Sequence, residues 1–211
     1  MCIAIVARTK FPSREFLECS LEQNQDGAGI AWIENGLVHW KKGLSTLEEI
    51  YEFEAKGPPW LVHFRISTVG GKIAPLCHPF PVTPDCSTAL EGAAEKVLIH
   101  NGHWSEWWEV EMRSLQRGEM LPDEPWSDTK AMAHMGSIYG DGLFRLIASK
   151  PGNKIATMNN LGEIKTYGDW TEFKEEELLA SNNPLSRSKT YFSKGATGNQ
   201  YCLGKTYELT G

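Results

Sequence analysis

The chain has 211 residues, of which 41% are hydrophobic and 23% charged, and its formal net charge at pH 7 is −6. This length and composition favour one large globular domain over two small ones. The surplus of acidic groups argues against nucleic acid as a partner, because phosphate recognition requires a basic surface.

Further features of the sequence bear on where the protein works. No apolar run approaches the ~18 residues that a membrane-spanning helix needs, and the N-terminus lacks the apolar segment of a secretion signal. The five cysteines are odd in number and form no close pair of the C-x-x-C type, which favours reduced thiols over a disulfide scaffold. We therefore expect a cytoplasmic protein without a membrane partner.

The first part of the chain alternates the patterns of strands and helices. Apolar runs rich in β-branched residues predict strands over residues 3–7, 29–33, 37–40 and 60–66. Helices are expected over residues 13–21 and 45–55. The Asn35-Gly36 pair between two of these strands is a strong signal for a hairpin.

The remainder begins with a loop over residues 70–95, which is rich in glycine and proline. The pattern then predicts a strand over 96–99, helices over 104–117 and 127–139, an apolar stretch over 143–149 that fits strand or helix, and a hairpin over 154–158 and 163–167. The last forty residues are polar, and we expect short irregular elements there. This order of elements favours an α+β fold with antiparallel sheets.

Cys2 stands directly after the initiator methionine. Aminopeptidases usually remove such a methionine before a small residue, which would leave a thiol and a free α-amine on the same residue. An α-amine has a pKa near ~7.7–8.0, well below the ~10.4 of lysine, and a base of that strength suits the activation of a thiol. The position of Cys2 alone is equally consistent with a structural role, as a small apolar residue at the start of a strand.

Four further stretches contain residue types that catalysis and binding use. In chain order they are His63-Phe64-Arg65-Ile66-Ser67-Thr68, Cys77-His78-Pro79-Phe80, His100-Asn101-Gly102 and Ser127-Asp128-Thr129. Each by itself has a simpler interpretation, because an arginine at a strand end is usually a surface charge, Asn-Gly a turn and Ser-Asp-Thr a helix cap.

Together with Cys2, and in this order, these stretches resemble the motifs of the class II glutamine amidotransferases, the glutaminase domains of the N-terminal-nucleophile hydrolase superfamily. The run Asn24-Gln25-Asp26-Gly27-Ala28-Gly29 is similar to a motif of the stand-alone members. The resemblance covers about residues 2–170 and implies a four-layer αββα sandwich of two antiparallel sheets. We accordingly expect a single domain over residues 1–211, with a poorly matched C-terminal extension from about residue 171.

The resemblance implies hydrolysis of the glutamine side-chain amide without a cofactor or metal. Cys2 would be the nucleophile and, through its own α-amine, the base, giving a γ-glutamyl thioester and ammonia. The side-chain amide of Asn101 and the backbone N–H of Gly102 would form the oxyanion hole. Ammonia would then pass to a partner synthase, or the protein would act as a free-standing hydrolase.

Selection of glutamine, a zwitterion, requires one fixed cation and one fixed anion. By the same resemblance Arg65 would bind the α-carboxylate, with a bidentate geometry that lysine lacks, and Asp128 would accept the α-ammonium group. Thr68 and Val69 would make further contacts with the substrate. Since the α-amine of Cys2 fills the role of base, His78 and the histidine at position 100 are expected to be structural.

Three alternatives remain at this point. The substrate could be another γ-glutamyl or acyl amide, because stand-alone members include such enzymes. A metal site could form from His63, His78, His100 and His103, although no pair among them has the spacing of a structural zinc site. The chain could also be a non-catalytic binding or regulatory module that keeps the fold.

Overall fold

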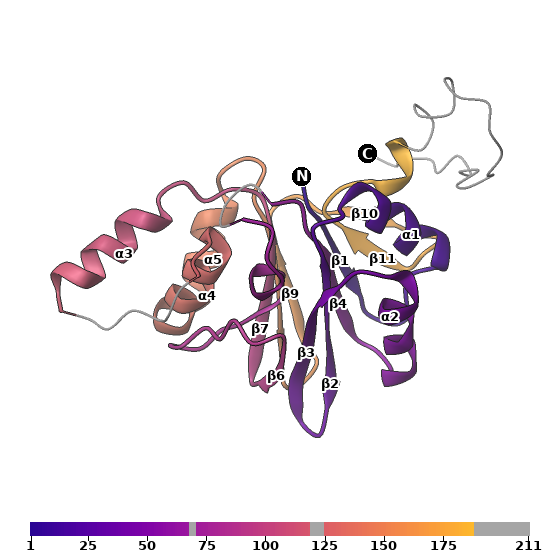
Figure 1. The fold of residues 1–211 in the computed structure, drawn as a ribbon, viewed down its shortest axis with the longest axis horizontal. Coiled ribbons are helices and arrows are strands. Elements are labelled where there is room, and N and C mark those ends of the chain that lie inside the picture. The colour runs from indigo at the N-terminus through magenta and orange to yellow at the C-terminus, as the bar shows by residue number, and fades with distance from the viewer. Residues whose placement is uncertain (68–70, 119–124, 188–211) are drawn as a thin grey trace.

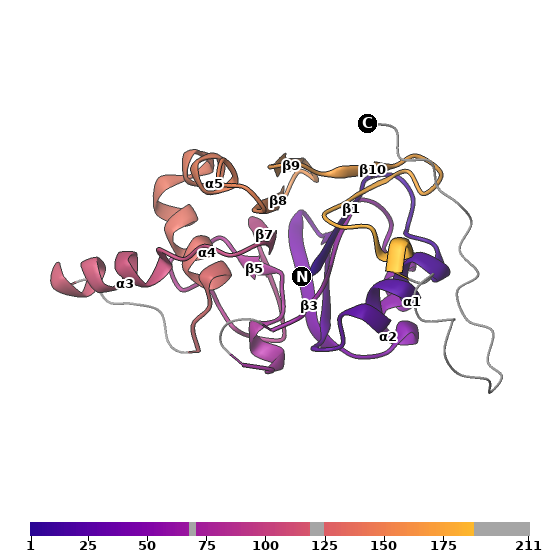
Figure 2. The ribbon, with the colours of Figure 1, turned by 90° about the horizontal axis from the view of Figure 1, so that it is seen from above.

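The structure, a computed structural model, describes residues 1–67, 71–118 and 125–187. Within these residues two β-sheets pack face to face, and helices cover the outer face of each sheet (Figure 1). Seen from above, the layers follow one another as helices, small sheet, large sheet and helices (Figure 2). The expected four-layer αββα sandwich is therefore confirmed.

The large sheet contains seven strands within the described residues, and every neighbouring pair is antiparallel. In chain order they are β1 (Ile3–Ala7), β2 (Ala28–Glu34), β3 (Leu37–Leu44), β4 (Trp60–Phe64), β6 (Glu91–Ala94), β10 (Thr171–Phe173) and β11 (Leu178–Ala180). Across the sheet they lie in the order β10-β11-β1-β4-β2-β3-β6. Strand β1 is thus an inner strand, between β11 and β4.

The small sheet has four strands within the same residues, again all antiparallel. They are β5 (Phe80–Pro81), β7 (Lys96–Asn101), β8 (Lys154–Asn159) and β9 (Ile164–Tyr167), in the order β5-β7-β8-β9. Strand β7 is an inner strand here, and its end lies near the start of β1.

Helices cover both sheets from outside. On the large sheet lie α1 (Arg14–Gln23) and α2 (Leu47–Tyr51), which continues into the 3-10 helix η1 (Glu52–Lys56); on the small sheet lie α4 (Asp128–Tyr139) and α5 (Asp141–Ala148). The helix α3 (Trp107–Gln116) projects beyond α4, and the 3-10 helices η2 (Ala74–Leu76) and η3 (Pro184–Arg187) are short (Figure 1). None of the described helices is long and apolar enough to cross a membrane.

Strand β1 explains why the layers stack in this way. Ile3 and Ile5 belong to the apolar cluster under α1 and α2, whereas Ala4 and Val6 belong to the cluster between the two sheets. Successive side chains of a strand point to opposite faces, so a strand that is apolar at every position is stable only when both of its faces are covered. The continuous apolar run at the N-terminus therefore requires a layer on each side.

Local signals in the sequence are confirmed where the geometry is local. Asn35 and Gly36 both have positive φ, 51° and 73°, which two-residue hairpin turns require. The stretch 143–149, which fitted strand or helix, falls almost entirely in the helix α5 (Asp141–Ala148). The expected loop over 70–95 is wrong in part, because it contains β5, β6 and η2, which are too short to give a periodic pattern.

The C-terminal part of the described chain differs from the expectation. Residues 171–180 form β10 and β11, regular strands of the large sheet beside β1, rather than irregular elements. Their inward-facing residues Phe173, Leu178 and Ala180 belong to the core under α1. Three-residue strands carry too few positions for alternation to be recognised, so only the packing reveals them.

Candidate active site

The candidate site lies where the start of β1 meets the ends of β4 and β7 and the first turn of α4. A cavity of about 30 Å3 is found there, lined by Cys2, Arg65, Ile66, Leu76, His78, His100, Gly102, Ser127, Asp128 and Thr129. The structure thus brings together four of the predicted site residues, although they stand far apart in the sequence. These four are Cys2, Arg65, Gly102 and Asp128.

Cys2 is placed by the pairing of β1 with β4. Ile3 pairs with Phe64, so Cys2 lies level with the residues just beyond the end of β4. Its sulfur accepts a hydrogen bond from the backbone N–H of Ile66 at 3.4 Å. Burial raises the pKa of the Cys2 thiol, and the bond from Ile66, the N-terminal amine and the Arg65 guanidinium oppose this shift only in part. At neutral pH the thiol is therefore protonated and needs a base to become a nucleophile.

Arg65 is a buried cation directly after β4, with only 4% of its surface exposed. Its backbone N–H donates to the Gly27 carbonyl at 2.9 Å, and its backbone carbonyl accepts from Asp26 at 3.1 Å. The guanidinium Nη1 donates to the carbonyl of Gly71 at 2.7 Å. A guanidinium carries five N–H donors in a planar fork, a geometry that matches the two oxygens of a carboxylate.

Asn101 and Gly102 stand at the end of β7. The Asn101 side chain is buried, and its Nδ2 donates to Ser181 Oγ at 2.9 Å. Gly102 has φ of +148°, and a Cβ there would lie 2.4 Å from Asn153 Oδ1. Gly102 lines the cavity, whereas Asn101 is next to it in the chain. Only glycine fits this approach of the backbone to Asn153.

Asp128 is the first residue of α4 and is held on several sides. Ser127 caps the helix by accepting a hydrogen bond from the Lys130 N–H at 3.1 Å. Asp128 Oδ1 accepts from the Thr129 N–H at 2.8 Å, and Oδ2 accepts from the Trp104 N–H at 3.1 Å. Among the described residues that line the cavity, this buried carboxylate is the acidic group.

Three buried histidines cluster at the cavity, and two of them, His78 and His100, line it. The rings of His63 and His78 lie 3.9 Å apart, His63 Nε2 lies 3.1 Å from the His100 carbonyl, and the His100 N–H donates to His78 Nδ1 at 3.4 Å. Burial lowers the pKa of His63 to about 3 and that of His78 well below its ordinary value. Among the described residues no group of three or more histidines, cysteines or carboxylates could hold a metal ion.

Two of the residues predicted to contact the substrate, Thr68 and Val69, lie outside the part of the chain that the structure describes. Conversely, two residues that the sequence did not single out touch the site: Ser181 binds the Asn101 side chain, and Asn182 Nδ2 donates to the Cys2 carbonyl at 2.7 Å. No motif marks them, and they follow a segment whose sequence pattern predicts no strand.

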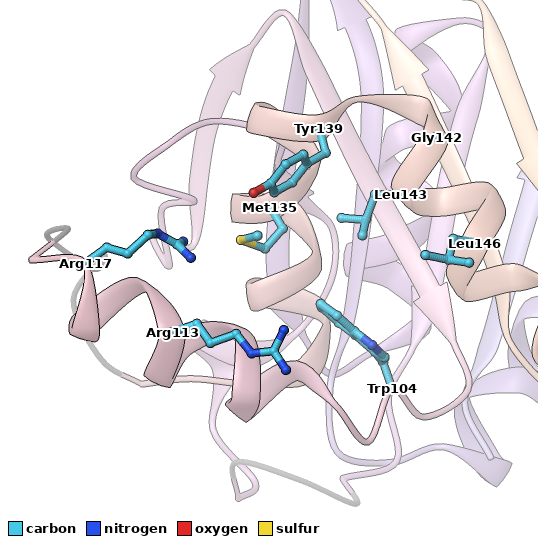
Figure 3. Close-up of a pocket in the computed structure, with 8 residues that line it drawn as sticks. All are labelled: Trp104, Arg113, Arg117, Met135, Tyr139, Gly142, Leu143 and Leu146. Carbon is cyan, nitrogen blue, oxygen red and sulfur yellow. The ribbon is translucent and has the colours of Figure 1, made fainter.

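A second and larger cavity, of about 450 Å3, lies in the groove between α3, α4 and α5 (Figure 3). Apolar side chains and two arginines surround it: Trp104, Arg113, Arg117, Met135, Tyr139, Leu143 and Leu146, together with Gly142. Among the described residues, its lining contains no thiol, carboxylate or histidine, which are the groups that amide hydrolysis uses. We therefore place the candidate site at the smaller cavity, beside Cys2.

Two solved structures share this architecture. Glutamine phosphoribosylpyrophosphate (PRPP) amidotransferase from B. subtilis, in complex with ADP and GMP, has a TM-score of 0.59 and 18% sequence identity, over 86% of this chain and 42% of that chain. The allosteric regulatory enzyme of purine biosynthesis has a TM-score of 0.62 and 18% identity, with the same coverage of both chains. No sequence-family model and no curated protein matches the chain.

These likenesses define the class of fold. The chain shares the αββα fold of these two structures, one of which is an amidotransferase, and the expected fold is confirmed. The chain spans less than half the length of the two solved structures that it matches.

Proposed function

We propose that this chain hydrolyses the side-chain amide of glutamine, with Cys2 as the nucleophile after removal of Met1. The observation that carries the proposal is the lining of one cavity by a thiol, a buried arginine, a buried carboxylate and a glycine at positive φ. A nucleophile, an oxyanion donor and a pair of opposite charges for a zwitterion are the groups this reaction needs.

In the proposed reaction the α-amine of Cys2 takes the thiol proton, and the sulfur attacks the amide carbon of glutamine. The negative charge on the amide oxygen is stabilised by the Asn101 side-chain amide and the Gly102 N–H. The Cys2 ammonium then gives its proton to the leaving nitrogen, the C–N bond breaks, and ammonia departs from a γ-glutamyl thioester. Water, deprotonated by the same amine, cleaves the thioester and releases glutamate.

The raised pKa of the Cys2 thiol supports the need for this base. The two histidines that line the cavity, His78 and His100, do not replace it, because burial lowers the pKa of both and a buried ring cannot readily take up a proton. An α-amine on the same residue is close to the thiol by covalent geometry.

For substrate binding, Arg65 is assigned the α-carboxylate and Asp128 the α-ammonium group of glutamine. Both side chains are buried in the lining of the cavity, and an acyl amide that lacks these two charges would form an ion pair with neither of them. Another γ-glutamyl amide, which keeps both charges, is the second candidate substrate. Measurement of kcat/KM for glutamine, for γ-glutamyl anilide and for a simple acyl amide distinguishes these three classes of substrate.

The fate of ammonia is a further part of the proposal. The matched solved structures are more than twice as long as the part that this chain covers, and we propose a partner synthase as the acceptor. A kcat/KM for glutamine well below the ~10⁴–10⁸ M⁻¹s⁻¹ typical of enzymes acting on their own substrates supports a dependence on such a partner. A value within that range for the isolated chain supports a free-standing hydrolase.

The direct test joins mass spectrometry with inhibitor labelling. The intact mass of the purified protein should lack Met1, and diazo-oxo-norleucine should label Cys2 alone. Cys2→Ala should abolish ammonia release, while Cys19→Ala, which changes a buried thiol in α1, should keep it. Retention of Met1 in active protein, or full activity of Cys2→Ala, would falsify the mechanism.

A further inference from the structure

Two polar residues directly after β11 bind the residues to which the proposed function assigns the reaction. Ser181 is fully buried and Asn182 is half-buried. We propose that both are positioning residues for amide hydrolysis: Ser181 fixes the side chain of Asn101, and Asn182 fixes the backbone of Cys2. This inference rests on the proposed function and concerns how its reacting groups are held.

The hydroxyl oxygen of Ser181 accepts two hydrogen bonds, from the Ala4 N–H and from Asn101 Nδ2, both at 2.9 Å. A side-chain amide has two N–H donors in one plane. One N–H of the Asn101 side-chain amide donates to Ser181, and this bond fixes the orientation of the amide plane. The direction of the second N–H is therefore fixed as well. An oxyanion donor lowers the barrier only if it is oriented before the charge develops, so Ser181 determines whether Asn101 serves as one.

The backbone of Ser181 is fixed to both sheets. Its N–H donates to the Ala4 carbonyl at 2.8 Å, and its carbonyl accepts a hydrogen bond from Lys154 Nζ. Ala4 belongs to β1 of the large sheet, whereas Lys154 opens β8 and pairs with Asn101 in the small sheet. The Ser181 hydroxyl is therefore held relative to the elements that carry Cys2 and Asn101.

Asn182 holds the nucleophilic residue itself. Its Nδ2 donates to the Cys2 carbonyl at 2.7 Å, one residue before the first ladder pair of β1. Chain ends are poorly ordered unless they are tied down, and Cys2 becomes a chain end when Met1 is removed. The bond from Asn182 uses neither the thiol nor the α-amine, so it can restrain Cys2 while both remain available for reaction.

The role of Ser181 is tested by a double-mutant cycle with Asn101. Ser181→Ala should lower kcat for glutamine by roughly 10- to 100-fold, with KM changed less than about threefold, because the misplaced donor acts on the transition state. Alkylation of Cys2 by iodoacetamide, which forms no oxyanion, should keep its rate. In protein that already carries Asn101→Ala, Ser181→Ala should lower kcat by less than about threefold.

The matched control is Ser20→Ala, which removes another fully buried hydroxyl, bonded to the Phe16 carbonyl within α1. It should leave kcat unchanged. If Ser181→Ala does not fold, Ser181→Cys replaces it, since a thiol has similar size and is a weak acceptor. If the Ser181 variants keep the wild-type kcat, Ser181 is not a positioning residue. The same conclusion follows if they lose kcat equally in the presence of Asn101 and in the Asn101→Ala background.

The role of Asn182 is tested by comparing Asn182→Ala with Asn183→Ala, its neighbour in the chain. The first should lower both kcat and the rate of Cys2 alkylation by on the order of 10-fold, because the thiol is less well placed. The second removes a cap of the Leu185 N–H and should change neither. Equal behaviour of the two variants overturns the role of Asn182.

These outcomes remain separate from the proposed function. If wild-type protein that lacks Met1 releases no ammonia from any glutamyl amide, the proposed function fails. If the wild type is active and the variants match it, only the positioning roles fail.

Discussion

Gly102 shows how a single residue joins the chemistry of the site to its packing. A Cβ at this position would lie 2.4 Å from Asn153 Oδ1 and 2.8 Å from Asn153 Cα. Asn153 is not free to withdraw, because its Oδ1 accepts the His103 N–H at 3.0 Å and lies 3.0 Å from His100 Nε2. Any side chain at 102 would therefore displace the backbone that carries the proposed oxyanion donor.

Gly102→Ala should accordingly reduce kcat by on the order of 100-fold, the cost of losing one oxyanion donor. It should also lower the free energy of unfolding by about 1–3 kcal/mol, through strain at a positive φ. Steady-state ammonia release and urea denaturation measure the two effects. Gly36→Ala is the matched control: it also has positive φ but meets no atom within 4 Å, so it should lose stability and keep its kcat.

At the scale of an element, α4 is the helix on which the site depends most. Ser127 caps it, Asp128 opens it, and the residues from Asp128 to Gly136 are all buried. A helix that starts at a fixed residue and is buried over its first two turns has little freedom to shift along its axis. The cap therefore determines where the Asp128 carboxylate stands in the cavity.

Ser127→Ala should lower the free energy of unfolding by about 1 kcal/mol through loss of the cap, and it should raise KM for glutamine because the carboxylate loses its fixed position. Thr46→Ala removes the comparable cap of α2, away from the cavity. It should show a similar loss of stability with an unchanged KM. Equal KM values for the two variants would contradict the role of the cap in placing Asp128.

The strand β10 belongs to the core, although its sequence looks like that of a loop. Phe173 is 3% exposed, and its ring packs edge-on against Phe16 of α1 with centroids 5.1 Å apart. Phe173→Ala should lower the free energy of unfolding by about 3–5 kcal/mol, the usual cost of removing a buried aromatic ring. Leu161→Ala, at a side chain that is 78% exposed in the turn between β8 and β9, should change it by less than about 0.5 kcal/mol.

At the scale of the whole molecule, the two sheets meet at the buried histidines. His63 belongs to β4 of the large sheet, and its ring contacts the carbonyl of His100 in β7 of the small sheet. His78 packs against the His63 ring. Burial lowers the pKa of all three, with Asp128 opposing the shift at His100. The junction between the sheets therefore depends on neutral rings.

These lowered pKa values predict that stability falls in acid. An unfolded histidine has a pKa near ~6.5, whereas burial lowers that of His63 to about 3. Between these values the unfolded chain binds a proton that the folded chain does not, so the free energy of unfolding should fall by about 1.4 kcal/mol per pH unit for this histidine. Urea denaturation at pH 5.5 and 4.5, both inside this range, measures the slope. His63→Asn should remove the contribution of this one histidine to the pH dependence of the free energy of unfolding. If the slope is unchanged in this variant, His63 is not its source.

The sequence alone was sufficient for the features that local chemistry controls. The turn at Asn35-Gly36, the cap at Ser127 and the continuous apolar run of β1 each depend on a few adjacent residues. The order of Cys2, Arg65, Asn101-Gly102 and Asp128 along the chain was enough to suggest a fold, which the structure confirms, and a site whose chemistry stays a prediction.

Only the tertiary structure decided which further residues belong to that site. Ser181 and Asn182 reach Ala4, Asn101 and Cys2 across separations of 177, 80 and 180 residues. No local pattern encodes such contacts, because a buried serine and an exposed one look alike in the sequence. Their placement follows from β11 pairing with β1, and that pairing becomes stable only when the core under α1 has formed.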